Sequence, residues 1–284
     1  MPGAFSDQQR SIRNPDAFRR HYGPWALITG ASEGTGEHFA LQLAEAGLDC
    51  VLVARREEAL NALARRLEDE YAVRTRTIVQ DLSSHHAGGE ILARVADLEI
   101  GLLVANAGVG GGGAFHQRSL QDWKQLVQVN VHCTLELCHG LVPAMLERNR
   151  GGLLLMGSRV GLGGITGSSV YAACKGFTLN LAEALWVDYR PHGLDVLNVL
   201  APAMDTPSLR RAAGAMIDAG MFPDLYQPEE VVRMALEALP DGPCLVFPVD
   251  TEKDTWQEVM VARRTRAATA GQASRRLQDK TASN

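Results

Sequence analysis

The sequence predicts a single α/β domain in which helices cover both faces of a doubly wound, parallel, seven-stranded sheet. Two observations predict it. Short runs rich in Val, Ile and Leu recur along the chain, and longer segments with helical periodicity separate them. The runs are mostly apolar rather than alternating, as expected for strands that are covered on both sides. The expected strands are Trp25–Thr29, Cys50–Ala54, Thr75–Gln80, Leu102–Asn106, Leu153–Gly157, Asp195–Leu200 and Leu245–Pro248.

The segments between the first strands have the period of an α-helix. Residues Glu37–Ala46 place Phe39 and Leu43 on one face, and Glu57–Glu70 carries a similar stripe that includes Leu60. Strand and helix alternate several times, which gives right-handed crossovers. Such sheets bind ligands beyond the carboxyl ends of their strands, so the turns after the strands are where a site is expected.

Composition restricts the class of protein. The 284 residues include 28 Lys and Arg against 33 Asp and Glu, a formal net charge of −5, which argues against a nucleic-acid partner. No apolar run reaches the roughly 18 residues of a membrane span, and the N-terminal region lacks the apolar stretch of a signal peptide. The five cysteines form no CxxC pair, which favours reduced thiols and a cytoplasmic location. No metal site is expected.

Glycines follow the first expected strand. The run from Thr29 to Gly36 reads TGASEGTG and leads directly into a helix. Glycines let the backbone turn tightly and approach a pyrophosphate, and a helix N-terminus offers free N–H groups. The GxxxGxG spacing differs from the general GxGxxG fingerprint. Its position after a buried strand favours a nucleotide site over a simple helix cap.

The end of the second strand indicates which nucleotide. NAD sites place an acidic residue there for the ribose 2′-hydroxyl, but here Ala54 is followed by Arg55 and Arg56. A carboxylate repels a 2′-phosphate, whereas a guanidinium binds it through two charge-assisted hydrogen bonds. NADP(H) is therefore expected, with Arg55 as the first candidate to hold the phosphate. The alternative is a pair of surface arginines at a helix start.

A tyrosine and a lysine lie four residues apart in the run YAACK. On a helix Tyr171 and Lys175 share one face, and the ammonium is expected to lower the pKa of the phenol and make it an acid/base near neutrality. Ser158 ends the fifth expected strand, from where its hydroxyl can reach the same carbonyl oxygen. Asn130 lies in a helix among apolar residues and needs a polar partner.

Two further motifs complete a pattern. Asp81 follows the third strand, and the run Asn106-Ala107-Gly108 closes the fourth. With the glycine turn and the YAACK run, they resemble the short-chain dehydrogenase/reductase family over roughly Trp25 to Thr206. The resemblance implies a Rossmann-type fold and a catalytic tetrad of Asn130, Ser158, Tyr171 and Lys175. It also implies cofactor contacts at Gly30, Ser32, Gly34, Thr35, Gly36, Arg55, Arg56, Asp81, Leu82, Asn106, Ala107, Gly108, Tyr171, Lys175 and Thr206.

The resemblance implies a role for each member of the tetrad. Tyr171 donates a proton to the substrate carbonyl oxygen while a nicotinamide delivers hydride, and oxidation reverses both steps. Ser158 binds the same oxygen, so Ser158 and Tyr171 are the expected substrate-binding residues. Lys175 holds the nicotinamide ribose, and Asn130 positions a water that extends the proton relay.

The chain departs from the family pattern at two positions. Pro202 is followed by Ala203 where Pro-Gly is common, so the backbone that leads to Thr206 is less free to adopt a positive φ. Glu33 lies in the glycine turn where many NADP-dependent members carry a basic residue. The 2′-phosphate must therefore rely on Arg55 and Arg56.

The substrate is expected to be a bulky hydrophobic ketone or secondary alcohol. The family's usual lid falls at about residues 203–226, where Arg210 and Arg211 either meet a carboxylate or stay solvated. Segments at residues 21–34, 206–209 and 254–256 resemble bacterial 7β-type hydroxysteroid dehydrogenases, which makes a steroid or other polycyclic one candidate. The alternatives are a 3-oxoacyl or aryl-ketone reductase and a non-catalytic NADP-binding scaffold. The apolar lid residues that would line the pocket are Leu209, Met216, Ile217, Met221, Phe222 and Leu225.

The expected organisation is an N-terminal extension at 1–24, the domain at 25–250 and a C-terminal tail at 251–284. The tail is either a solvated helix or a segment that packs over the active site or a neighbouring subunit through Trp256, Val259 and Met260. By analogy with the family, a homodimer or homotetramer is expected through helices at Leu120–Leu135 and Tyr171–Tyr189.

Overall fold

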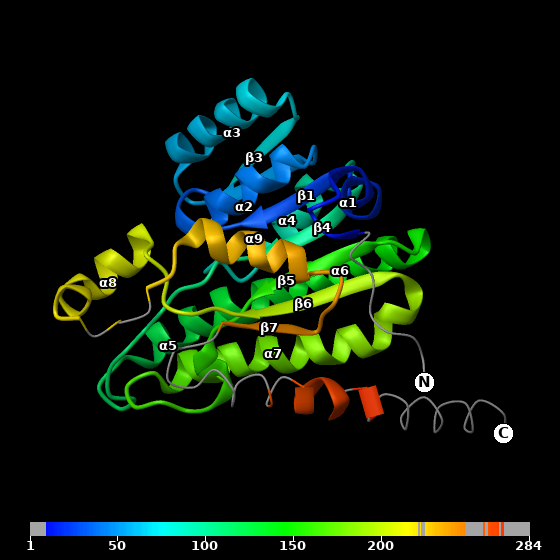
Figure 1. Ribbon diagram of the computed structural model, residues 1–284. Helices are drawn as coiled ribbons and strands as arrows, with labels where there is room; N and C mark the ends of the chain where they lie inside the picture. Colours follow the sequence, from blue (N-terminus) through cyan, green and yellow to red (C-terminus); the bar gives the residue numbers. More distant parts are fainter. Residues whose placement is uncertain are drawn as a thin grey trace.

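Seven parallel strands form one sheet in the order β3-β2-β1-β4-β5-β6-β7 (Figure 1). The computed structural model describes residues 10–220, 222, 225–247, 258, 261–266 and 268–269. Met221, Trp256, Val259 and Met260 of the expected lid and tail lie outside the described residues, as does the segment 254–256. The strands are β1 (Trp25–Thr29), β2 (Asp49–Ala54), β3 (Thr75–Val79), β4 (Ile100–Ala105), β5 (Gly151–Met156), β6 (Leu194–Leu200) and β7 (Cys244–Val246).

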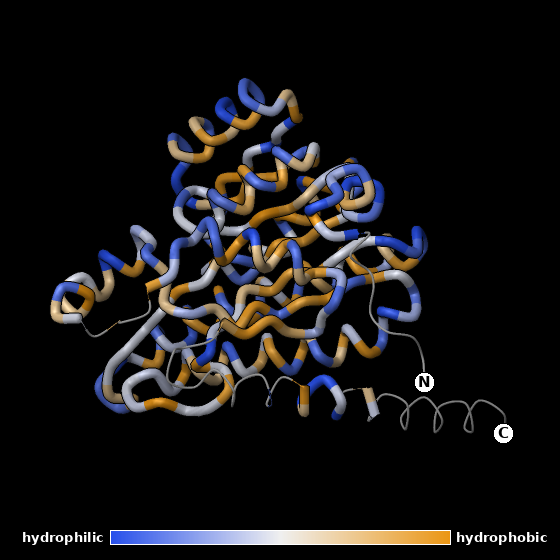
Figure 2. Tube along the Cα trace, viewed as in Figure 1, coloured by the Kyte–Doolittle hydropathy of each residue, from blue (hydrophilic) through white to orange (hydrophobic). Residues whose placement is uncertain are grey.

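Helices cover both faces of the sheet, which confirms the doubly wound Rossmann-type fold. Residues of α1 (Pro15–Tyr22), α2 (Gly34–Glu45), α3 (Glu57–Tyr71) and α9 (Pro228–Ala238) pack into the core on one face. Residues of α4 (Ala87–Arg94), α6 (Cys133–Arg148) and α7 (Ser169–Tyr189) pack into the core on the other. Figure 2 shows the hydrophobic residues gathered along the central strands. The remaining helices are α5 (Leu120–Val127) and α8 (Pro207–Asp218), with a π-helical turn at Gln128–His132 and 3₁₀ turns at Arg159–Leu162 and Arg190–His192.

The central strands are buried along their whole length, as their continuous apolar sequences predict. Every residue of β1, β4, β5 and β6 is buried. The edge strand β3 differs, because only Ile78 of its five residues is buried. Charged pairs flank this edge, with Arg74 bound to Asp49 at 2.6 Å and Arg76 bound to Asp97 at 2.6 Å. Charges at an open edge discourage pairing with another chain.

The segment before β1 is part of the core. Phe18 and Tyr22 of α1 are fully buried, and the Tyr22 hydroxyl donates to Asp195 Oδ2 at 2.7 Å. His21 and Arg10 reach the same carboxylate, at 3.2 and 3.3 Å. These residues therefore anchor the stretch expected as an extension beneath β6, at the end of the sheet that lies away from the strand carboxyl ends.

Part of the C-terminal region lies against α7. Arg263 binds Glu183 of α7 at 2.6 Å, and Arg264 donates to Asp241 O at 2.9 Å. The described piece of the tail thus covers part of the helix through which association was expected. Within the described part of the chain, no helix is long and apolar enough to cross a membrane.

Candidate active site

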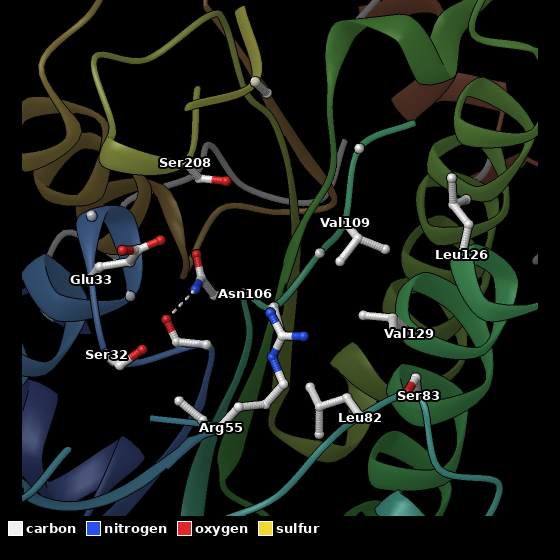
Figure 3. Close-up of a pocket in the computed structure, with 18 of the residues that line it drawn as sticks. Ser32, Glu33, Arg55, Leu82, Ser83, Asn106, Val109, Leu126, Val129 and Ser208 are labelled. Carbon is white, nitrogen blue, oxygen red and sulfur yellow. Dashed lines mark hydrogen bonds between the residues drawn. The ribbon is translucent and has the colours of Figure 1, made fainter. Parts of the chain in front are cut away.

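Two cavities open at the carboxyl ends of the strands and share one wall. The first, of about 1130 Å³, follows the ends of β1, β2 and β4 (Figure 3). The second, of about 1060 Å³, lies beside the ends of β5 and β6 and beneath α8. The two cavities therefore adjoin, so that molecules bound in them would be neighbours. The shared wall consists of Thr35, Asn106, Gly108, Gly110, Gly111, Gly112, Thr206, Ser208 and Ala212.

The structure places all the expected cofactor residues in these two cavities. Tyr171 and Lys175 line the second, and the other thirteen line the first. Thr206 caps α8 by accepting a hydrogen bond from Leu209 N at 3.1 Å, and Ala203 before it does not adopt a positive φ. The replacement of the usual glycine by Ala203 thus leaves Thr206 at the wall between the cavities.

The glycine turn is tied to the end of β4. Asn106 Nδ2 donates to Thr29 O at 2.9 Å and to Gly30 O at 3.3 Å (Figure 3), and Ala107 N donates to Thr29 Oγ1 at 3.0 Å. A Cβ added at Gly36 would lie 2.0 Å from Gly30 O, so only glycine fits there. The turn is thus a compact backbone cradle at a helix N-terminus, which fits the pyrophosphate of a dinucleotide.

Three arginines and one glutamate surround the far end of the first cavity. Arg56 binds Glu33 at 2.8 Å, and Arg211 of α8 donates to the same carboxylate at 3.1 Å. These contacts, that of Arg211 first, lower the pKa of Glu33. Figure 3 shows Arg55 extending into the cavity, and its guanidinium has no ion pair with the described residues. Of the three arginines, Arg55 is thus the one whose charge is not offset by Glu33.

Asp81 lies at the end of β3, at the rim of the same cavity. Its carboxylate accepts a hydrogen bond from Ser83 N at 3.0 Å. This bond, together with the weaker influence of the Arg55 charge, lowers the pKa of Asp81. The carboxylate is thus held ionised as an acceptor where the resemblance implies an adenine.

Tyr171 and Lys175 lie one turn apart on α7, and Ser158 follows β5. The Lys175 ammonium donates to Met156 O at 2.8 Å and lies 5.6 Å from the centre of the Tyr171 ring. Because Lys175 is buried, its pKa is lowered to about 8. All three functional side chains line the second cavity. The structure therefore brings together the phenol, the hydroxyl and the ammonium that the sequence singles out.

The effect on Tyr171 differs from the sequence-based expectation, which was a pKa lowered by Lys175. Burial raises the pKa of Tyr171, and the hydrogen bond with the Ser158 hydroxyl offsets only part of that increase. Lys175 directs its ammonium toward Met156 O, which explains its small influence on the phenol. A phenol with a raised pKa is protonated at neutral pH and can donate a proton.

Asn130 lies behind the second cavity rather than in its lining. It occupies the π-helical turn, from which its Nδ2 donates to Val109 O at 3.0 Å and Leu126 O at 2.9 Å. Its Oδ1 is buried and has no partner among the described residues. This oxygen and the Lys175 ammonium both lie close to Gly108, since a Cβ there would lie 3.0 and 3.3 Å from them. A buried acceptor in such a place fits a bridging water.

Apolar side chains form most of the second cavity. Of the expected lid residues, Leu209 and Phe222 line it, whereas Met216 is exposed and Ile217 and Leu225 lie elsewhere. Other apolar contacts come from Met156, Val160, Ile165, Pro202, Ala203, Met204 and Ala213. The cavity thus suits a large hydrophobic molecule.

Two glycine-rich loops border the mouth of this cavity. Gly110–Gly113 follows the NAG motif, and residues Gly161–Gly167 follow Ser158. They are joined by a hydrogen bond from Gly113 N to Gly167 O of 2.9 Å. Ile165 in the second loop is half exposed at 49%. The loops leave an apolar opening with few side chains.

Sequence reasoning missed two residues near Ser158. Arg159 lines the second cavity directly after Ser158. Asn198 of β6 is fully buried beneath Gly157, and both polar atoms of its amide have no partner among the described residues. A polar residue inside an apolar strand is the signal that could have identified Asn198.

Comparisons with known proteins agree with the geometry. The family model described as short chain dehydrogenase matches residues 24–215. A 7β-hydroxysteroid dehydrogenase of Clostridium sardiniense is 29% identical over 225 residues, covering 78% of this chain and 84% of that protein. A very-long-chain 3-oxoacyl-CoA reductase of Aspergillus oryzae is 32% identical, covering 73% of this chain and 63% of the reductase.

Two solved structures share the fold at similar identity. A short-chain dehydrogenase from Sphingobium yanoikuyae in complex with NADPH has a TM-score of 0.74 at 32% identity, over 86% of this chain and 94% of that one. The bulky-bulky ketone specific alcohol dehydrogenase from Comamonas testosteroni has a TM-score of 0.75 at 31% identity, over 86% and 93%.

Proposed function

The chain belongs to the short-chain dehydrogenase family, and from this premise we propose that it interconverts a bulky hydrophobic ketone and its secondary alcohol with NADP(H). As a member of that family it is an oxidoreductase with a nicotinamide cofactor. The proposal extends this to the cofactor's phosphate, the kind of substrate and the residues that act. The observation that carries it is the wall shared by a polar dinucleotide groove and an apolar cavity that holds Tyr171.

The choice of NADP(H) rests on the charges at the far end of the groove. The two residues directly after β2 are arginines rather than an acid, and Arg55 extends into the cavity without an ion pair among the described residues. Glu33 is neutralised by Arg56 and Arg211, so its repulsion of a phosphate is reduced. The NADPH complex of the Sphingobium relative supports the same choice.

Tyr171 and Ser158 act on the carbonyl oxygen. When bound, the nicotinamide supplies or accepts the hydride at the carbonyl carbon. In reduction, the Tyr171 hydroxyl gives its proton to the oxygen, and the Ser158 hydroxyl donates a hydrogen bond to it. Burial keeps Tyr171 protonated before the reaction. In oxidation the tyrosinate takes the proton back.

Lys175 and Asn130 restore the proton. The Lys175 ammonium, whose pKa is about 8, lies beside the Tyr171 ring and close to Gly108. Asn130 Oδ1 lies close to the same Cβ position of Gly108 and accepts a hydrogen bond from a water. That water passes a proton between Lys175 and the solvent.

The substrate class rests on the apolar lining, its volume and the relatives. The cavity of about 1060 Å³ admits a polycyclic ketone. The similarity to a 7β-hydroxysteroid dehydrogenase and to the bulky-bulky ketone specific enzyme supports this class. The similarity to very-long-chain 3-oxoacyl-CoA reductases favours a second candidate, reduction of a 3-oxoacyl thioester.

The test is the loss of NADPH absorbance with three kinds of ketone: a steroid ketone, an aryl ketone and a 3-oxoacyl-CoA. We expect turnover of the steroid or aryl ketone with NADPH and much slower turnover with NADH. Preference for the thioester would select the second candidate. Tight NADPH binding without turnover of any ketone would indicate the non-catalytic scaffold. The homodimer or homotetramer and the cytoplasmic location stay predictions, and a mass measurement in solution tests the former.

A further inference from the structure

The described lining of the second cavity includes basic side chains and no carboxylate. Among the described residues that line it, the ionisable side chains are Arg159, Tyr171 and Lys175. Tyr171 is a protonated phenol, and Lys175 is buried against Met156 O. Arg159 is thus the one lining side chain of this described set that carries a permanent charge without a place in the proposed reaction.

The backbone of Arg159 is fixed at the end of the sheet. It is the first residue of the 3₁₀ turn that Ser158 caps, and its N–H donates to Ala201 O at 3.3 Å. Ala201 in turn follows β6. The side chain therefore starts from a rigid position, one residue from the hydroxyl that is proposed to bind the substrate carbonyl.

The Arg159 guanidinium has no counter-ion within the described part of the chain. It makes no hydrogen bond or ion pair with any described residue, although it is only partly exposed. The arginines of the lid differ, because Arg210 binds Asp205 at 2.6 Å and Arg211 binds Glu33. A charge that is partly buried beside an apolar cavity loses part of its hydration. An anionic ligand that binds the Arg159 guanidinium would compensate for that loss.

We propose that Arg159 binds a carboxylate of the substrate, so that the substrate of this site is a bulky apolar keto acid or the matching hydroxy acid. This rests on the proposed ketone reductase function. One guanidinium matches the two oxygens and single charge of a carboxylate through parallel hydrogen bonds. The apolar lining holds the hydrocarbon that joins the carboxylate to the ketone.

The test compares a polycyclic keto acid with its methyl ester. Arg159→Met keeps the length of the side chain and removes its charge, and Arg210→Met is the matched control outside both cavities. We expect Arg159→Met to lower kcat/KM for the acid by roughly ten- to a hundred-fold, and for the ester by less than about threefold. Arg210→Met should leave kcat/KM unchanged for both the acid and the ester. The wild-type preference for the acid should decrease as salt is raised.

The possible outcomes distinguish failure of the Arg159 carboxylate site from failure of the proposed ketone reductase function. Equal loss for acid and ester in Arg159→Met, or no wild-type preference for the acid, overturns the carboxylate site and leaves the ketone reductase standing. A preference for a 3-oxoacyl-CoA that depends on Arg159 would assign the guanidinium to the phosphates of that thioester and overturns it too. If neither the acid nor the ester is reduced with NADPH or NADH, the ketone reductase function and the carboxylate site both fail. A decrease of kcat/KM in Arg159→Met for the acid but not for the ester supports both.

Discussion

The two cavities that meet at Gly108 are built on opposite principles. The cofactor groove is shaped by backbone, with a glycine turn held by Asn106, and its outer end is a network of ion pairs around Glu33. The substrate cavity is shaped by apolar side chains and bare loops, with one guanidinium. A groove built from backbone accepts one ligand closely, whereas a cavity built from side chains changes with each substitution. Four substitutions test this contrast, from the largest expected effect to the smallest.

Replacing Tyr171 by Phe tests whether the two cavities share one reaction centre. We expect kcat to fall by roughly two to four orders of magnitude, since the proton donor is lost. The Kd of NADPH, measured by fluorescence, should change by less than about threefold. Residual turnover within tenfold of the wild type would place the proton donor elsewhere. A large loss of NADPH affinity would show that the two regions are not separable.

Replacing Lys175 by Met tests whether the buried ammonium beside the two cavities lowers the free energy of unfolding. Burial lowers the pKa of Lys175 from 10.5 to about 8, so the folded protein binds the proton less tightly than the unfolded chain. The charge therefore destabilises the fold by up to about 3 kcal/mol below pH 8, and the cost disappears as the pH rises toward 10.5. The variant also loses the hydrogen bond from Lys175 to Met156 O, which offsets part of this gain. We therefore expect Lys175→Met to stabilise the fold by about 2 kcal/mol at pH 7.

The measurement for Lys175→Met is the free energy of unfolding in urea at several pH values. The variant should be inactive and more stable at pH 7, and its advantage should shrink between pH 8 and 10.5. If Lys175→Met is less stable than the wild type at pH 7, the buried ammonium stabilises the fold.

Replacing Arg55 by Met tests whether loss of this charge weakens NADPH binding without affecting the substrate cavity. The Kd of NADPH should rise roughly ten- to a hundred-fold, because a charge-assisted contact to the 2′-phosphate is lost. The Kd of NADH and the KM of the ketone should be nearly unchanged. Arg65→Met, on the exposed face of α3, is the control. If NADPH and NADH weaken equally, Arg55 does not recognise the phosphate.

Replacing Glu33 by Gln has the smallest expected effect. The change removes the negative charge and leaves Arg56 and Arg211 free to attract a phosphate, so NADPH should bind about two- to fivefold more tightly. Glu37→Gln, in the first turn of α2, is the matched control. Weaker NADPH binding in Glu33→Gln would show that the carboxylate organises the two arginines rather than opposing the phosphate.

The two regions also differed in how far the sequence predicted them. The strands and the turns that follow them depend on local patterns, and all fifteen expected cofactor residues line the cavities. The ion pair between Glu33 and Arg211 depends on how α8 lies over the glycine turn, which no local pattern contains. Arg159 went unnoticed because an arginine after a serine has no signature. The pKa of Tyr171 was misjudged because burial, a tertiary property, outweighs a neighbouring charge.

The bare loops at the mouth of the substrate cavity have a consequence for how readily the protein can acquire new specificities. A Cβ added at Gly163 or Gly164 meets nothing within 4 Å, and neither has a positive φ. A Cβ at Gly36 would instead collide with the backbone of the glycine turn. Mutations at the mouth can therefore be accepted one at a time without loss of the fold. A laboratory selection for altered ketone preference should find its first gains there, while the groove stays constant.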